Sequence, residues 1–212
     1  MNLQNYYYYF QSALTPRFCD ELIKYGISQQ EQLALTGGQT EKVNKGKPLD
    51  DKDIIDLKKK RDSNIVWLND RWIYKEIQPF IHQANKLANW NFDWSFSESC
   101  QFTKYKLNQF YDWHADAWES AYDNPSNPDT HGKIRKLSVT CSLSAPEDYE
   151  GGELEFDFRN TDPDKQSVRK CAEIKPRGSI VVFPSFVWHR VKPVTKGTRY
   201  SLVIWNLGYP YK

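Results

Sequence analysis

The stretch LSVTCSL, residues 137–143, alternates apolar and polar side chains over its whole length. A second stretch, ELEFDF at 153–158, alternates in the same way, with acidic residues at the polar positions. Successive side chains of a β-strand point to opposite faces of a sheet, so a period of two is typical of a strand with one apolar and one polar face. Both stretches therefore predict half-buried β-strands.

Further strands are expected on either side of this pair. Residues 179–183 and 200–207 are largely apolar runs that end at Pro184 and Gly208. Apolar runs of this length between turn residues favour strands in the core of a sheet. The segment DYEGG at 148–152 predicts a hairpin or bulge connection, because glycine is typical of such turns.

The part of the chain before residue 99 has a helical pattern. Thr15-Pro16 predicts a helix start, since threonine caps a helix and proline fits its first turn. Residues 70–89 also read as a helix, which Pro79 should kink or restart. Residues 36–53 are polar and contain glycine, which predicts a mobile loop. One face of the 70–89 helix would carry Ile73, Ile77, Phe80, Ile81, Ala84 and Leu87.

Helices followed by short strands predict an α+β protein, with a double-stranded antiparallel β-fold and helices packed on one side. No linker rich in Pro, Gly or Ser divides the 212 residues. One domain is therefore expected over 1–212, with a helical part at about 1–99 and a strand-rich core at about 100–208.

The bulk properties disfavour several classes of protein. A formal net charge of +2 gives no global electrostatic case for nucleic acid or a membrane. The four cysteines form no CxxC pair, which argues against a zinc or redox motif. The start MNLQNYYYYF has no signal-peptide pattern, and no stretch is apolar enough to span a membrane. A reducing cytoplasm is the expected location.

Three residues form a candidate metal site. His114 and Asp116 make an HxD pair after the strand-like QFTKYKL, and His189 follows the strand-like GSIVVFP. Two imidazoles and one carboxylate match the facial triad of non-haem Fe(II) oxygenases, which leaves positions for a bidentate 2-oxo acid and O2. A lone HxD pair arises often by chance, so a hydrogen-bonded loop histidine is the alternative for His114.

Arg199 lies soon after His189, in the strand-like TRYSLVIW. Alternation along a strand can point this guanidinium into the fold. A buried arginine needs an anion, and the distal carboxylate of 2-oxoglutarate is a natural bidentate partner. An ordinary ion pair with Asp or Glu is the alternative.

Four segments together resemble the prolyl-hydroxylase branch of the 2-oxoglutarate- and Fe(II)-dependent dioxygenases. They are YKLNQFYDWHAD (105–116), DYEGGELEF (148–156), PRGSIVVFPSFVWHRV (176–191) and GTRYSLVIW (197–205). The resemblance covers about residues 61–207. It implies a double-stranded β-helix, or jelly-roll, core and a hydroxylase that uses Fe(II), 2-oxoglutarate and O2, with ascorbate as an optional reductant.

The resemblance also assigns roles to individual residues. It places iron on His114, Asp116 and His189. It places the distal carboxylate of 2-oxoglutarate on Arg199, with a further hydrogen bond from Tyr105. The sequence departs from the family where a second tyrosine is replaced by Ser144, so the co-substrate pocket is expected to be lined differently. The gap from Tyr105 to the first histidine is also one residue shorter than in animal oxygen-sensing members.

The resemblance extends to the substrate. KRDSNIVWL (60–68) resembles the segment that carries a substrate-contacting arginine in the oxygen-sensing prolyl hydroxylases, and Arg61 matches that arginine. Their substrate-contacting tryptophan matches Trp205, and Trp67 follows the same pattern. A prolyl residue in a peptide or protein is thus the implied substrate. The alternatives are a solvated charge for Arg61, at the end of the run Lys58–Lys60, and core packing for both tryptophans.

Residues 117–133, rich in Asn, Pro, Ser and Gly, predict a mobile loop that could close over a peptide together with 36–53. His131 in this loop is expected at the surface, and His82 is expected to be an ordinary helix residue rather than a ligand.

Three alternative functions stay open. The same chemistry could act on a free amino acid or another side chain. A nucleic-acid demethylase of the same superfamily is disfavoured by the balanced charge. A non-enzymatic jelly-roll binding module would have no need of the triad with Arg199. A monomer is the expected state.

Overall fold

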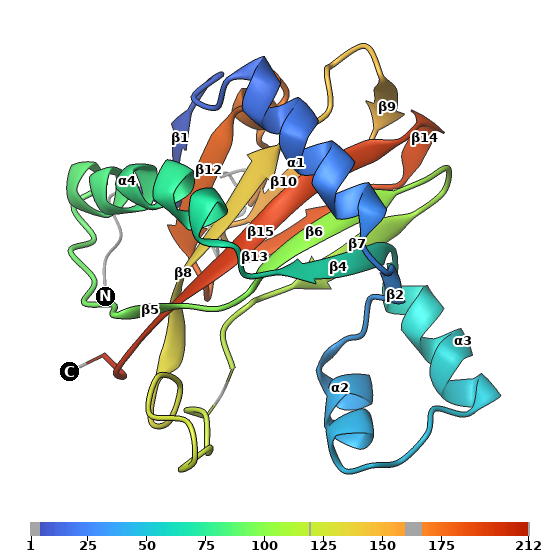
Figure 1. Ribbon diagram of the computed structural model, residues 1–212, viewed down its shortest axis with the longest axis vertical. Helices are drawn as coiled ribbons and strands as arrows, with labels where there is room; N and C mark the ends of the chain where they lie inside the picture. Colours follow the sequence, from blue (N-terminus) through green and yellow to red (C-terminus); the bar gives the residue numbers. More distant parts are fainter. Residues whose placement is uncertain (1–4, 119, 160–166, 212) are drawn as a thin grey trace.

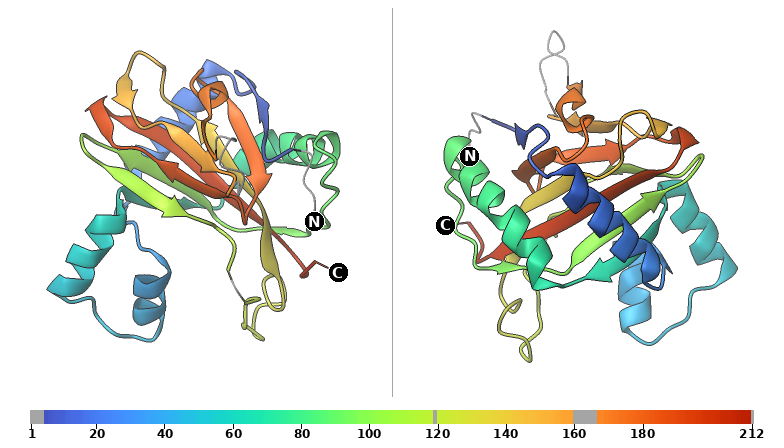
Figure 2. Two further views of the ribbon diagram at one scale, coloured as in Figure 1. Left: turned by 180° about the vertical axis from the view of Figure 1, so that it is seen from behind. Right: turned by 45° about the horizontal axis from the view of Figure 1, so that its top comes forward.

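The computed structural model describes residues 5–118, 120–159 and 167–211. Two β-sheets pack face to face, and helices cover the outer face of the larger sheet (Figures 1 and 2). The predicted α+β class and the helices on one side of the strands are confirmed. None of the helices in the described ranges combines the length and hydropathy that a membrane-spanning segment needs.

The larger sheet has eight strands, in the order β1-β12-β8-β15-β6-β4-β2, with β5 pairing to β15. Their bounds are β1 Tyr8–Phe10, β12 Ile180–Pro184, β8 Ile134–Ser142, β15 Arg199–Gly208, β6 Cys100–Tyr105, β4 Asn64–Leu68, β2 Gln32–Leu33 and β5 Phe96–Ser97. The strands pair antiparallel throughout, and β8 and β15 run side by side through the middle.

The smaller sheet has five strands in the order β11-β10-β13-β7-β3. They are β11 Val168–Lys170, β10 Leu154–Asp157, β13 Trp188–Val191, β7 Phe110–His114 and β3 Arg61–Asp62. A separate ladder joins β9 (Tyr149–Gly151) to β14 (Val194–Gly197). Of the predicted hairpin or bulge connection at 148–152, the hairpin is wrong, because β9 pairs with β14 while β10 pairs with β11 and β13. The pairing of β9 with β14 does contain a register shift, between Val194 and Lys196.

Two helices, α1 (Pro16–Ser28) and α4 (Arg71–Leu87), lie against the larger sheet. The start of α1 is as predicted, since the Thr15 hydroxyl accepts a hydrogen bond from the Phe18 amide. Pro79 does not restart α4, which continues through it. Burial of apolar residues before and after Pro79 holds the helix together despite the missing N–H. The buried face of α4 comprises Ile73, Ile77, Ile81 and Ala84, whereas Leu87 is exposed.

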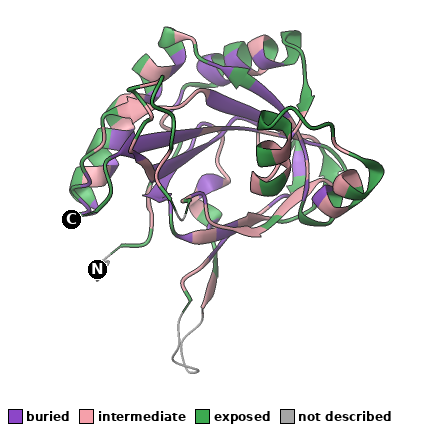
Figure 3. Ribbon diagram, turned by 90° about the horizontal axis from the view of Figure 1, so that it is seen from below, coloured by how far each residue is buried: buried purple, intermediate pink, exposed green. Residues whose placement is uncertain are grey.

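The polar positions of the 137–143 stretch are buried, contrary to the half-buried strand that the pattern predicted there, whereas Glu153 and Asp157 of the second stretch are only partly buried. Ser138, Thr140 and Ser142 of β8 are at most 7% exposed. The apolar face of β8 packs with the helices, and its polar face points into the space between the two sheets. Both faces of β8 are therefore covered. Figure 3 shows buried strands in purple at the centre of the molecule. The two packed sheets together form a barrel, and the polar side chains of β8 line its interior.

The first 99 residues are not purely helical. They supply β1, β2, β4 and β5 to the larger sheet and β3 to the smaller one. The segment 36–53, predicted as a loop, contains α2 (Gly37–Asn44) and the start of α3 (Asp51–Lys60). These two helices form an arm that extends from the barrel (Figure 1). No residue of α2 is buried, so its sequence lacks the apolar stripe by which an amphipathic helix is recognised.

Candidate active site

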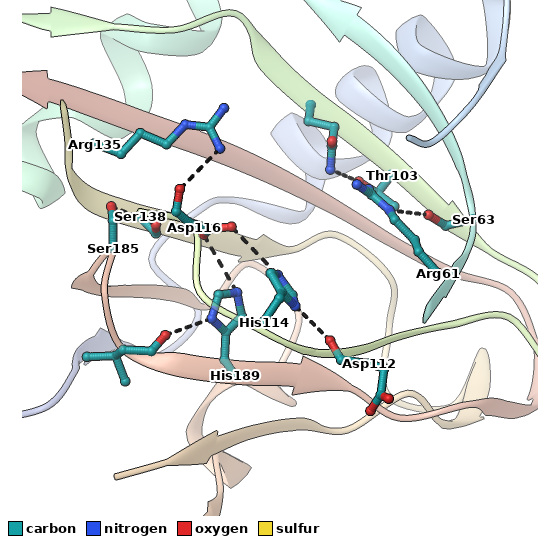
Figure 4. Close-up of polar contacts among 12 residues, drawn as sticks. Arg61, Ser63, Thr103, Asp112, His114, Asp116, Arg135, Ser138, Ser185 and His189 are labelled. Atoms are coloured by element: carbon teal, nitrogen blue, oxygen red, sulfur yellow. Dashed lines mark hydrogen bonds and ion pairs between the residues drawn. The ribbon is translucent and has the colours of Figure 1, made fainter. Parts of the chain in front are cut away.

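Three predicted ligands meet at one end of the smaller sheet. His114 ends β7 and lies opposite His189 of β13 in the strand register. Each Nε2 atom lies 3.6 Å from a different carboxylate oxygen of Asp116. The ligand atoms of the three residues all lie within 4.8 Å of one another. The strand pairing thus brings together residues that are far apart in the chain (Figure 4).

Backbone carbonyls fix both imidazole rings. Nδ1 of His114 lies 2.8 Å from the Asp112 carbonyl, and Nδ1 of His189 lies 3.0 Å from the Val187 carbonyl. A carbonyl can only accept, so each Nδ1 carries the proton and donates it. Each Nε2 then keeps a lone pair directed at the common point, which is the usual arrangement of metal-ligating histidines.

The loop after β7 holds the carboxylate ligand. The amides of Asp116 and Ala117 both donate to the Ser185 carbonyl at 2.9 Å. Ser185 and Ser138 share a hydroxyl hydrogen bond of 2.9 Å beneath this loop. Arg135 donates to the Asp116 carbonyl at 3.5 Å. These contacts leave the two carboxylate oxygens of Asp116 directed at the histidines.

The protonation states suit a metal ion. Burial lowers the pKa of His114 to about 3, and neighbouring His189 adds to the effect. Burial of Asp116 opposes its ionisation, but His189, His114 and Arg135 outweigh it, so the pKa of this carboxyl lies below its usual value. At neutral pH the site therefore holds a neutral imidazole and a carboxylate, the forms that bind a metal. Two nitrogens and one oxygen are the donor set of non-haem Fe(II) centres, so the residues fit Fe(II).

Arg199 lies in the barrel interior beside the triad. It is 2% exposed and pairs with Tyr105 in the register of β15 and β6. Its Nη1 donates to the Ser201 hydroxyl at 3.2 Å. Within the described part of the chain no Asp or Glu forms an ion pair with Arg199, so the ion-pair alternative finds no support there. The Arg199 side chain lines the same cavity as the triad, and Tyr105 lines it as well.

Ser144, which replaces the second family tyrosine, is engaged with the backbone. Its hydroxyl accepts from the Tyr200 amide at 2.7 Å and lies 3.4 Å from the Thr198 carbonyl. The polar lining of the cavity comes instead from Thr140, Ser201 and Gln101. None of these three residues was predicted as a site residue from the sequence. For Thr140 the available signal was the polar half of the alternating stretch 137–143, which was interpreted as facing solvent.

A groove opens from the triad toward the arm of α2 and α3. It is lined by Arg61, Tyr111, His114, Asp116 and five tryptophans: Trp67, Trp113, Trp118, Trp188 and Trp205. Both predicted substrate-contacting residues thus lie in a groove that is also lined by two of the three candidate ligands, His114 and Asp116. His82 and His131 do not line it. His82 stacks on Trp94, and the His131 ring accepts from the Asn124 amide.

Arg61 is buried rather than solvated, which contradicts the surface-charge alternative. Arg61 is 4% exposed, and its guanidinium lies 4.4 Å from the centroid of the Tyr111 ring. The Tyr111 ring also stacks on the His114 ring, with 3.5 Å between the ring centroids. The Nε of Arg61 donates to Ser63 and its Nη1 to the Leu35 carbonyl. Nη2 is buried and has no hydrogen-bond partner among the described residues.

Trp205 forms the wall beside Asp116. It is 6% exposed, and its ring centroid lies 6.1 Å from that of Trp67. Its Nε1 is the second buried donor that lacks a partner among the described residues. The residues that hold Trp205 in place were not predicted from the sequence. Arg135 stacks on Trp205, and Glu98 receives hydrogen bonds of 2.7 Å from both Arg135 and Tyr122.

Known proteins resemble part of this chain in sequence and resemble its fold. A hydroxylase from Hyphomonas neptunium, described as PKHD-type, is 41% identical over 92 residues, which are 42% of this chain and 37% of that protein. A PKHD-type hydroxylase from a Synechococcus strain is 41% identical over 78 residues, or 36% of this chain and 31% of that protein. The chain therefore spans about a third of the length of these relatives.

Solved structures confirm the jelly-roll fold. The viral collagen prolyl hydroxylase of Paramecium bursaria Chlorella virus-1 superposes with a TM-score of 0.62 at 20% identity, covering 97% of each chain. A prolyl-4-hydroxylase from Pseudomonas putida gives a TM-score of 0.58 at 16% identity, covering 96% of this chain and 92% of that one. At these identities the likeness establishes the fold alone.

The sequence profile of one family matches the strands that carry the triad and Arg199. It is described as the 2OG-Fe(II) oxygenase superfamily, and it matches residues 100–206, about half of the chain. The oxygenases of this family use Fe(II), 2-oxoglutarate and O2, for which the donor set and the buried arginine are suited. On this match the chain belongs to the 2OG-Fe(II) oxygenase superfamily.

Proposed function

We propose that the protein is an Fe(II)- and 2-oxoglutarate-dependent hydroxylase, with iron held by His114, Asp116 and His189. The observation that carries this proposal is the convergence of two oriented Nε2 atoms and one carboxylate within 4.8 Å. Only three protein ligands converge there among the described residues, which leaves coordination positions for a co-substrate.

Arg199 and Tyr105 would bind the distal carboxylate of 2-oxoglutarate. Arg199 is buried and has no ion-pair partner in the described ranges, so a bound carboxylate would neutralise it. A guanidinium can bind both oxygens of a carboxylate at once, which fixes the orientation of the co-substrate. The Tyr105 hydroxyl would add one hydrogen bond from the paired strand.

The bound iron and 2-oxoglutarate supply the oxidation of an unactivated C–H bond, and the protein orients and shields that reaction. The backbone carbonyls of Asp112 and Val187 keep the two imidazole rings in place. Phe183 packs edge-on against the His189 ring at 4.7 Å and, with Val191 and Leu154, gives the cavity an apolar lining. This lining would exclude bulk water from the reacting groups.

The proposed substrate is a prolyl residue in a peptide or protein. The groove beside the triad contains two buried donors without partners, Nη2 of Arg61 and Nε1 of Trp205. Buried donors in native proteins are nearly always paired, so oxygen atoms of a bound peptide would satisfy both. The flat wall of Trp205 suits a proline ring. A related fold, a prolyl hydroxylase from Trichoplax adhaerens, was solved with a peptide fragment.

We further propose that residues 1–212 act as one domain and as a monomer in the cytoplasm, with ascorbate as an accessory reductant. All four cysteines are free and buried, which suits a reducing compartment.

The test is incubation of the protein with Fe(II), 2-oxoglutarate and ascorbate together with panels of peptides, oligonucleotides and free amino acids. Succinate release is measured for each panel, and mass spectrometry identifies the product. The proposal expects succinate and the addition of one oxygen with proline peptides but not with alanine-substituted versions. Stimulation by oligonucleotides or free amino acids alone would replace the prolyl substrate and keep the oxygenase. Absence of succinate with every panel would point to a binding module.

A further inference from the structure

The groove has a second feature at its far wall, the N-terminal turn of α2. Thr36, Gly37, Gly38 and Thr40 line the groove there, together with Lys60 and Arg61. The first amides of a helix have no acceptor within the helix and carry a partial positive charge. An uncapped helix N-terminus that faces a groove can bind an anion, provided that other groups at the site also attract a negative charge.

No side chain caps this turn. Thr36 occupies the N-cap position, but its hydroxyl bonds to the Gln39 side chain instead of to an α2 amide. No hydrogen bond reaches the amides of Gly37, Gly38 or Gln39 from any described residue. A Cβ added at Gly38 would meet no atom within 4 Å, so the space beside Gly38 is open, whereas Gly37 faces the Trp118 ring.

Arg61 gives independent evidence for an anion at the same place. Its Nη1 donates at 3.2 Å to the carbonyl of Leu35, which directly precedes the N-cap residue Thr36. Arg61 is only 4% exposed, and its Nη2 has no hydrogen-bond partner among the described residues. Nearby Lys60 adds a positive charge. The carboxylate of Asp112 points away from Arg61 (Figure 4) and does not neutralise it.

We propose that the first turn of α2, backed by Arg61, is an anion subsite that binds a carboxylate of the peptide substrate. The inference rests on the proposed hydroxylase function and narrows its substrate to peptides with a carboxylate near the target residue. The carboxylate comes from an acidic side chain or from the end of the peptide. Its two oxygens accept from the free amides of α2 and from the guanidinium.

The test measures peptide binding by fluorescence anisotropy to the enzyme loaded with Fe(II) and 2-oxoglutarate, without O2 so that nothing turns over. Peptides carry proline or alanine at the centre, combined with Glu or Gln scanned along the flanks, and all have amidated ends. A parallel set has free C-termini. At one position, Glu peptides should bind about tenfold more tightly than Gln peptides, in both the proline and the alanine series.

The two sources of carboxylate give different results. Tighter binding of the internal Glu peptides assigns the subsite to an acidic side chain. Tighter binding of only the free-acid peptides assigns it to a chain end. Equal binding of all charged and neutral pairs overturns the subsite. Turnover with O2 tests the prolyl substrate separately, because proline-dependent succinate release without a carboxylate preference would leave the hydroxylase standing.

A matched set of variants tests the location. Gly38→Asp places a competing carboxylate at the first turn of α2, and Gly38→Asn is the neutral counterpart of the same size. Val43→Asp places the same charge at the far end of α2, where Val43 is exposed. Only Gly38→Asp should reduce the Glu-to-Gln preference toward one, with the folding of each variant checked by circular dichroism. A full preference retained in Gly38→Asp overturns the assignment to α2.

Discussion

The guanidinium carbon of Arg135 lies 3.9 Å from the centroid of the Trp205 ring. The same guanidinium donates to the carbonyl of Asp116, a proposed iron ligand, and to the carboxylate of Glu98. Tyr122, from the segment after the first two ligands, donates to the other oxygen of Glu98. One partly buried cation thus joins the wall of the substrate groove, the metal site and the 117–133 segment.

Trp205 should contribute both its flat face and its Nε1 donor to peptide binding. Trp205→Phe keeps an aromatic wall but loses the donor, so the KM for a proline peptide should rise by about fivefold, the value of one hydrogen bond. Trp205→Ala should raise that KM further. Separate titrations should show that both variants keep the affinity for Fe(II) and 2-oxoglutarate. Peptide kinetics like those of the parent in Trp205→Ala would remove this residue from the substrate site.

Arg199 should determine the affinity for 2-oxoglutarate. Arg199→Leu removes a charge-assisted bidentate pair, so the KM for 2-oxoglutarate should increase by roughly 100-fold. Arg199→Lys keeps the charge but loses the bidentate geometry of the guanidinium, so its KM for 2-oxoglutarate should lie between those of the parent and Arg199→Leu. Both values come from succinate release at saturating peptide. An unchanged KM for 2-oxoglutarate in folded Arg199→Leu would contradict the assignment.

His189→Ala should abolish turnover because it removes one of three iron ligands. Iron retained after dialysis, measured by absorption spectrometry, should drop with it, while circular dichroism should show an intact fold. His131→Ala is the matched control, since the His131 side chain is 48% exposed and does not line the groove. Turnover by His189→Ala above the metal-free background would rule out the proposed triad.

The stability of the metal-free protein should depend on His114. Its pKa is lowered to about 3 in the folded state from 6.5, because burial penalises the charged ring. Below pH 6.5 the unfolded chain therefore binds a proton that the folded chain does not, and the free energy of unfolding falls as the pH decreases. The loss should accumulate from pH 6.5 toward pH 3 and be absent above pH 7.

Urea unfolding at several pH values measures this effect in the presence of a chelator. His114→Gln cannot take up the proton, so its free energy of unfolding should decrease less between pH 7 and pH 4 than that of the parent. The difference between the two slopes isolates His114 from the other titrating groups. Parallel pH dependences in the parent and the variant would show that His114 titrates normally in the folded protein.

The sequence by itself determined the local features of this protein. The cap at Thr15 and the two-residue period of 137–143 are set by neighbouring residues, so their secondary structure could be predicted. The candidate ligands could also be predicted from the sequence, because an HxD pair followed by a later histidine and arginine can be recognised from residue types and their spacing alone. The structure places these ligands in one cavity.

Only the tertiary structure decided which faces are buried and which partners each side chain meets. The polar face of β8 faces the interior because a second sheet covers it, and no residue of β8 specifies that sheet. The Glu98–Arg135 pair joins the connection between β5 and β6 to β8 and has no local signature. Helix α2 buries none of its residues, so its pattern looked like a loop. Contacts between distant segments depend on how strands pair, which local periodicity does not encode.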